Sequence, residues 1–232
     1  MDTTELSPAE VQQEQEETLK EKLNKPVKLP PINWSVLLDD ILDILETVIF
    51  YGFILLMVFS YLIRPVTVEG RSMVPTLHNG DRLVMYRLFY QPKYGDIVVV
   101  NNRSGHLLQN GEVVESSSSL DECLIKRVIA TEGQELNILA ATGEVYIDGV
   151  LLDEPYINEK TLTDDGAFSY PITIPDGYVF VMGDNRNHST DSRNARVGLI
   201  KKDDILGTTF FRFGLGKDEE TGESLGSIGF VE

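Results

Sequence analysis

Residues 47–63 read TVIFYGFILLMVFSYLI, seventeen residues without a charge that separate two very different parts of the chain. Glu46 precedes this stretch, and Arg64 and Pro65 follow it. A run of this length is at the short end of what a helix needs to cross a bilayer core of about 30 Å. The sequence therefore predicts a membrane-spanning helix.

Three other structures fit such a stretch: a buried core helix, a helix lying in the membrane interface, and a cleaved secretory signal. A cleaved signal lies nearer the N-terminus, behind a basic region, and ends in small residues. This stretch follows an acidic tail and ends in Tyr61-Leu62-Ile63, which favours an uncleaved span. Basic residues lie on both sides of it, so the positive-inside rule leaves the orientation open.

The chain before the apolar stretch has two parts. Between 34 and 46, apolar residues recur every three or four positions with acidic residues between them, which is typical of an amphipathic helix. Residues 1–31 are rich in Glu, Gln and Lys and bury too little apolar surface to offset the cost of ordering the chain. We expect an acidic disordered tail over 1–31, and an amphipathic lead-in with a transmembrane anchor over 32–64.

The chain after Pro65 has the pattern of an all-β domain, residues 65–232. Short runs rich in Val, Ile, Tyr and Phe are separated by Gly, Asp and Asn. We expect strands at 65–69, 82–88, 96–101, 124–130, 136–139, 144–147, 177–182 and 208–213. Two Ser- or Asp-rich segments, 104–121 and 161–168, are expected to be exposed loops. The predicted fold class is mainly β, with one N-terminal transmembrane helix.

Composition excludes several classes of protein. Of the 232 residues, 42% are hydrophobic and 25% are charged, as in ordinary folded proteins. The formal net charge of −17 makes nucleic acid an unfavourable partner, because its phosphate backbone would be repelled. The single cysteine, Cys123, excludes an intramolecular disulfide and a Cys-rich metal site. Stability must therefore come from packing.

A candidate nucleophile follows the predicted span. Ser72 lies in residues 69–75, EGRSMVP. A nucleophilic serine needs an exposed oxygen beside backbone N–H groups that stabilise the developing oxyanion, and a nearby glycine permits that close approach. A serine before a proline-containing turn more often caps the turn, so this stretch alone does not identify an enzyme.

A nucleophilic serine needs a base. The three histidines all lie in turn-like or polar loop contexts: His78, His106 and His188. Lys126 instead lies in the apolar run 123–129, CLIKRVI, where burial would lower the pKa of its amine towards a value suited to a general base. The alternative is that Lys126 extends into solvent from one sheet face while Arg127 points to the other.

A third polar stretch, residues 183–193, reads GDNRNHSTDSR. Its alternating acidic and basic residues can form a paired network, and Ser189 can offer a hydroxyl that positions the lysine. Runs of this composition are usually solvated loops.

Together, the anchor, these three stretches and the run 94–99 resemble bacterial type I signal peptidases over about residues 34–213, in the single-span form of Gram-positive members. The resemblance implies that Ser72 is the nucleophile and Lys126 the general base, with Ser189 orienting the lysine. It assigns supporting positions to Gly70, Ser189, Asp184, Arg186, Asp191 and Arg193, the four charged residues forming an ion-pair network. It also implies shallow apolar substrate pockets lined by Val66, Val68, Met73, Leu77, Leu124 and Ile125.

By this resemblance the protein is a serine endopeptidase that removes signal peptides from exported preproteins at the outer face of the cytoplasmic membrane. It would have a cytoplasmic N-terminus, a single span and an extracellular catalytic domain, and would need no metal or cofactor. Its expected partners are preprotein signal peptides and the lipid bilayer, with the secretion translocon as a further candidate.

The sequence departs from the family pattern at two places. Gly70 stands where some members carry a serine that donates to the oxyanion, and residues 130–134, ATEGQ, replace the usual Gly-x-Pro-Gly-Asp turn.

Two rival functions are a noncatalytic surface protein on a membrane stalk and a self-cleaving repressor. A noncatalytic surface protein would not explain why a lysine, Lys126, lies in the middle of an apolar strand. A self-cleaving repressor would need a DNA-binding module where this chain has an acidic tail and a span.

Overall fold

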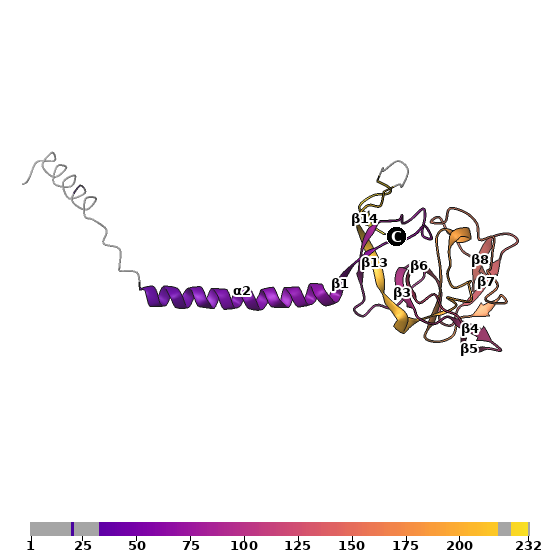
Figure 1. The fold of residues 1–232 in the computed structure, drawn as a ribbon, viewed down its shortest axis with the longest axis horizontal. Helices are drawn as coiled ribbons and strands as arrows, with labels where there is room; N and C mark the ends of the chain where they lie inside the picture. Colours follow the sequence, from indigo (N-terminus) through magenta and orange to yellow (C-terminus); the bar gives the residue numbers. More distant parts are fainter. Residues whose placement is uncertain (1–19, 21–32, 218–223, 232) are drawn as a thin grey trace, which may run out of the picture. The chain divides into compact units, whose positions relative to one another are not determined.

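The computed structural model describes Lys20, residues 33–217 and residues 224–231 (Figure 1). Except for Lys20, the expected disordered tail over 1–31 lies outside the described residues. The chain divides between Phe53 and Ile54 into two compact units. The described elements are, in chain order, α2 (Trp34–Leu62), β1 (Ile63–Thr67), β2 (Arg82–Tyr86), β3 (Ile97–Asn102), β4 (His106–Gln109), β5 (Glu112–Glu115), β6 (Glu122–Thr131), β7 (Glu135–Leu139), β8 (Glu144–Ile147), β9 (Val150–Leu151), β10 (Ile172–Thr173), β11 (Tyr178–Met182), η1 (Arg186–His188), β12 (Ile200–Lys201), η2 (Lys202–Asp204), β13 (Ile205–Gly214) and β14 (Gly229–Phe230).

Helix α2 joins the predicted amphipathic and apolar stretches into one helix. It ends at Leu62, three residues before Pro65, whose ring and missing N–H prevent the helix from continuing. The 27 residues Trp34–Ser60 have the length and composition to cross a membrane, and none of the most apolar window is buried. At 1.5 Å per residue they extend about 40 Å, enough for a bilayer core of about 30 Å. This exposure argues against the buried core helix considered above.

The larger sheet contains the strands that carry the candidate residues. Its described strands follow the order β1-β2-β13-β3-β6-β11-β12, and β14 also pairs with β13. Strand β6 pairs antiparallel with β3 on one side and with β11 on the other. Lys126 therefore lies in the middle of the sheet, opposite Val98 of β3.

The strands β6 and β11 are covered on both faces. Side chains of a strand alternate between the two faces, and on β11 Val179 and Val181 join one apolar cluster while Phe180 and Met182 join another. The second cluster also contains Leu136 of β7, in a smaller sheet of order β10-β7-β8-β9. This double cover removes the middle of β6 from water.

The mainly β fold with an N-terminal apolar helix is confirmed, and each of the eight expected strands overlaps an observed one. The expected exposed loop at 104–121 is wrong in part, because it contains the β4–β5 hairpin. Its turn is Asn110-Gly111, both with positive φ, and such an Asn-Gly pair favours a tight hairpin turn. The segment 161–168 is a loop as expected, but Thr161 and Phe168 at its two ends are buried.

Candidate active site

Ser72 lies in a tight turn that follows β1. Gly70, two residues earlier, has φ +83°, a left-handed conformation that favours glycine. The Gly70 N–H donates to Asn79 Oδ1 at 3.0 Å, and the Leu77 N–H donates to the Met73 carbonyl at 2.8 Å. The side chains of Met73 and Leu77 are buried beneath the turn. These contacts hold Ser72 half-buried on a packed base.

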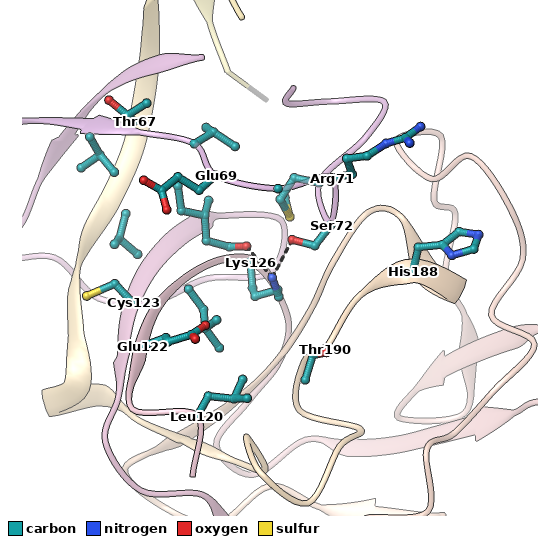
Figure 2. A pocket seen from close by; sticks show the side chains of 17 residues that line it. Thr67, Glu69, Arg71, Ser72, Leu120, Glu122, Cys123, Lys126, His188 and Thr190 are labelled. Atoms are coloured by element: carbon teal, nitrogen blue, oxygen red, sulfur yellow. Dashed lines mark hydrogen bonds between the residues drawn. The ribbon is translucent and has the colours of Figure 1, made fainter. Parts of the chain in front are cut away.

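Lys126 contacts Ser72 directly. Its Nζ donates to Ser72 Oγ at 2.7 Å and to the carbonyl of Ile125 at 3.0 Å (Figure 2). Only 3% of Lys126 is exposed, which excludes the solvent-facing alternative. Burial lowers the pKa of the amine from 10.5 to about 8, although nearby carboxylates partly oppose the shift. A hydroxyl therefore contacts an amine that can accept its proton near neutral pH.

The polar stretch 183–193 packs directly against the Ser72 backbone. The Asn185 N–H donates to the Ser72 carbonyl at 3.0 Å, and the Asn185 side chain donates to the Arg71 carbonyl at 3.0 Å. A Cβ at Gly183 would overlap the Ser72 carbonyl oxygen and Ser189 Oγ, so this close approach requires glycine. Asn185 was not among the sequence-predicted residues, yet it fixes the loop to the turn.

Asp184 joins the lysine strand to the serine turn. Its carboxylate accepts two hydrogen bonds from Arg127, at 2.9 and 2.7 Å, and one from Thr76 Oγ1 at 2.5 Å. Asp184 is completely buried, and Arg127 is 2% exposed. The Arg127 guanidinium also lies 4.0 Å from the centre of the Tyr156 ring. The residue next to Lys126 is thus linked to the turn that carries Ser72.

The other charged residues of the loop form two further pairs. Asp191 and Arg193 are both fully buried and share two hydrogen bonds of 2.8 Å. Burial alone would raise the pKa of Asp191, but Arg193 and the Gly183 N–H hold it below its ordinary value. Arg186 pairs instead with Glu154, which sequence analysis did not identify. The expected ion-pair network therefore has one pair within the loop and two that reach outside it.

Ser189 lies next to Gly183, and its Oγ is buried. Within the described residues, this oxygen has no hydrogen-bond partner. The bond from Ser189 to Lys126 that the resemblance implies is therefore not formed in this structure.

A cavity of about 590 Å³ adjoins the serine and the lysine. Five of the six expected substrate-pocket residues line it: Val66, Val68, Met73, Leu124 and Ile125. Leu77 does not line it and is fully buried beneath the turn. The lining also contains polar residues that were not predicted, namely Thr67, Glu69, Arg71, Glu122, Cys123, His188 and Thr190. Figure 2 shows the His188 ring directed away from Ser72, so it is not placed to act as the base.

Comparisons with known proteins identify the family. The signal peptidase family, peptidase S26, matches residues 41–214. A probable signal peptidase I-1 of Synechocystis sp. is 34% identical over 194 residues, 82% of this chain and 87% of the relative. A signal peptidase I of Bacillus licheniformis is 35% identical over 168 residues, 68% of this chain and 80% of the relative.

A crystal structure of a signal peptidase I from Enterococcus faecalis V583 covers 51% of this chain and 97% of that chain, at 23% identity and a TM-score of 0.36. That similarity is too low to bear on fold or function. The family match covers most of the chain, and the two relatives extend over most of their own lengths. The chain therefore belongs to the signal peptidase family, peptidase S26, and is a peptidase.

Proposed function

We propose that this peptidase removes signal peptides from exported preproteins, with Ser72 as the nucleophile and Lys126 as the general base. The observation that carries the proposal is the 2.7 Å contact between Lys126 Nζ and Ser72 Oγ beside a cavity that apolar side chains line in part. Membership of the signal peptidase family supports the substrate class. No third residue is needed to explain why the serine is activated, because burial itself makes the amine a usable base.

The reaction follows from the contact. With Lys126 neutral, the Ser72 hydroxyl donates its proton to Nζ as Oγ attacks the scissile carbonyl. The Lys126 ammonium then gives that proton to the leaving amine, the C–N bond breaks, and an ester to Ser72 remains. A water that loses its proton to Lys126 attacks the ester, and the proton returns to Oγ as the acid product leaves.

The oxyanion of the tetrahedral intermediate needs donors. The Ser72 backbone N–H donates no hydrogen bond within the described part of the chain, so it is available to this oxygen. Gly70 provides no side-chain donor, and its φ of +83° would strain any residue that replaced it. The turn conformation therefore favours a backbone donor over a serine at position 70.

The cavity supports specificity for small side chains. The acyl half of the substrate would lie extended beside β1 and β6, where backbone pairing gives affinity that depends little on sequence. Val68 and Ile125 line the cavity together with Ser72 and Lys126. A bulky residue before the cut would overpack this space, which typically costs about 1–3 kcal/mol, or roughly ten- to a hundredfold in rate.

We expect Val68→Ala and Ile125→Ala to widen the choice of residue at the first or third position before the cut. Mass spectrometry of products from a peptide library measures this choice. Leu77→Ala is the matched control, because Leu77 is buried outside the cavity and its loss should lower stability without changing the preference. An unchanged small-residue preference in both cavity variants would contradict the proposed pocket.

We further propose a single-pass topology. Residues 1–31 would lie in the cytoplasm, 32–64 would contain the anchor, and 65–232 would form the extracytoplasmic catalytic domain, close to the lipid surface and to the translocon that delivers preproteins. The apolar helix and the family support membrane anchoring. Protease added outside spheroplasts should degrade the catalytic domain while the membrane is intact. A catalytic domain that stays protected from protease until the membrane is broken would show the opposite orientation.

The proposed activity is tested with the full chain in detergent. It should cut a preprotein once, after a small residue at the end of the signal peptide, as read from the mass of the mature product. Intact preprotein after prolonged incubation would refute the proposal.

A further inference from the structure

Several ionisable side chains on the cavity rim have no part in the proposed chemistry. Glu69, Arg71, Glu122 and His188 all line the cavity and are exposed. Within the described residues, the carboxylates of Glu69 and Glu122 and the guanidinium of Arg71 form no ion pair or hydrogen bond. The buried carboxylates of the site, Asp184 and Asp191, are by contrast paired with arginines. The rim charges are therefore available to a substrate.

The acidic and basic rim residues lie at opposite ends of the cavity. Figure 2 shows Glu69 and Glu122 on one side of the Ser72–Lys126 contact, and Arg71 and His188 on the other. The chain explains this separation. Glu122 precedes Lys126 by four residues on β6, roughly 13 Å along an extended strand. Glu69 precedes Ser72 by three residues and lies between the end of β1 and the left-handed Gly70.

The basic end is fixed by the polar loop. Arg71 directly precedes Ser72, and Asn185 binds the carbonyls of both residues. His188 belongs to η1, which begins immediately after Asn185. Arg71 and His188 are therefore held on the same side of the nucleophile.

We propose that the cavity selects preproteins by charge on both sides of the cut. The proposal rests on the proposed function, which places the acyl half of the substrate beside β1 and β6. On these strands or directly after β1, Val66, Val68 and Leu124 line the cavity. These residues belong to the same segments as Glu69 and Glu122, so the end of the signal peptide meets the acidic rim. The leaving half, the start of the mature protein, passes Arg71. The preferred substrate carries a basic residue before the cut and an acidic residue just after it.

The expected size of this selection follows from exposure. Ion pairs between exposed groups change binding or rate by about two- to fivefold, and added salt screens them. We therefore expect each charged substrate position to change kcat/KM by about threefold relative to a neutral residue. The preference should weaken as ionic strength rises, whereas the preference for small residues should not.

The test uses five peptides that share one small-residue cleavage site. One is neutral, two carry Glu or Lys at the second position after the cut, and two carry Glu or Lys at the fifth position before it. The full-chain wild type should prefer Glu after the cut and Lys before it. Arg71→Glu should invert only the first preference, and the double variant Glu69→Gln/Glu122→Gln should abolish only the second. Each rate is divided by that variant's rate on the neutral peptide.

Lys201→Glu is the matched control. Lys201 is exposed on β12, which lies at the opposite end of the strand order from β1, and it does not line the cavity. It makes the same change in net charge as Arg71→Glu and should alter neither preference. Equal wild-type rates on all charged peptides, or inversion by Lys201→Glu as well, would overturn the charge selection. Failure of the wild type to cut any peptide, including the neutral one, would instead refute the proposed function. The wild-type comparison does not depend on whether a variant folds.

Discussion

Ser72→Ala and Lys126→Ala are each expected to lower kcat/KM for signal-peptide cleavage by roughly 10⁴-fold or more. The first removes the atom that forms the covalent intermediate, and the second removes the only group that hydrogen bonds to that atom in the described structure. The double variant should be no worse than either single variant, because residues that act as one unit lose their effect together. Mass spectrometry of the product formed over hours can detect so large a loss of cleavage rate.

Folding must be unchanged for this result to concern chemistry. Thermal unfolding of each variant should remain cooperative. Substantial turnover by Lys126→Ala would mean that another group is the base. A double variant far below both single variants would mean that the two residues act independently.

The second large effect concerns stability. Asp184→Ala is expected to lower the free energy of unfolding by about 3–5 kcal/mol, because it leaves the buried Arg127 guanidinium without its carboxylate. It also removes the acceptor of the Thr76 hydroxyl in the turn that carries Ser72. Chemical denaturation of the full chain in detergent measures the change.

Glu132→Ala is the matched control for this loss. Glu132 pairs with Lys202 at 2.6 Å, a distance similar to that between Arg127 and Asp184, but both side chains are substantially exposed. Its removal should cost much less than the removal of Asp184, because solvent screens an exposed pair. Similar losses in the two variants would show that burial of the Asp184 pair is not what makes it important.

The sequence predicts the parts of the fold that have a clear periodicity. The long strands β6 and β13 and the helix α2 are each recognisable from their own residues. The strands β9, β10, β12 and β14 have two residues each, too few to show alternation, and they form because a partner strand is already in place. The β4–β5 hairpin was missed although Asn110-Gly111 marks its turn, because the Ser-rich residues beside it suggest a loop.

The candidate site, like the fold, can be predicted only in part from the sequence. Ser72 and Lys126 were selected from local sequence, and the structure brings them into contact across 54 positions of the chain. The sequence does not reveal that Asp184 pairs with Arg127, or that Arg186 pairs with Glu154. Each pair joins residues more than 30 positions apart. Within the run 183–193, the alternating signs suggested neighbouring pairs, but only Asp191 and Arg193 pair with each other. Long-range pairing depends on strand register, which local composition does not specify.

The central claim is that Lys126 is the base, and its titration tests this most directly. A pKa of about 8 leaves roughly a tenth of the amines neutral at pH 7, compared with about one in three thousand for an ordinary lysine. Because the neutral form is the active one, kcat/KM should rise with pH through a midpoint near 8. In protein labelled at the lysine Cε, one NMR signal should titrate at the same midpoint and vanish in Lys126→Met. Lysine signals that all titrate near 10.5, or a rate controlled by a group near pH 6.5, would contradict the account.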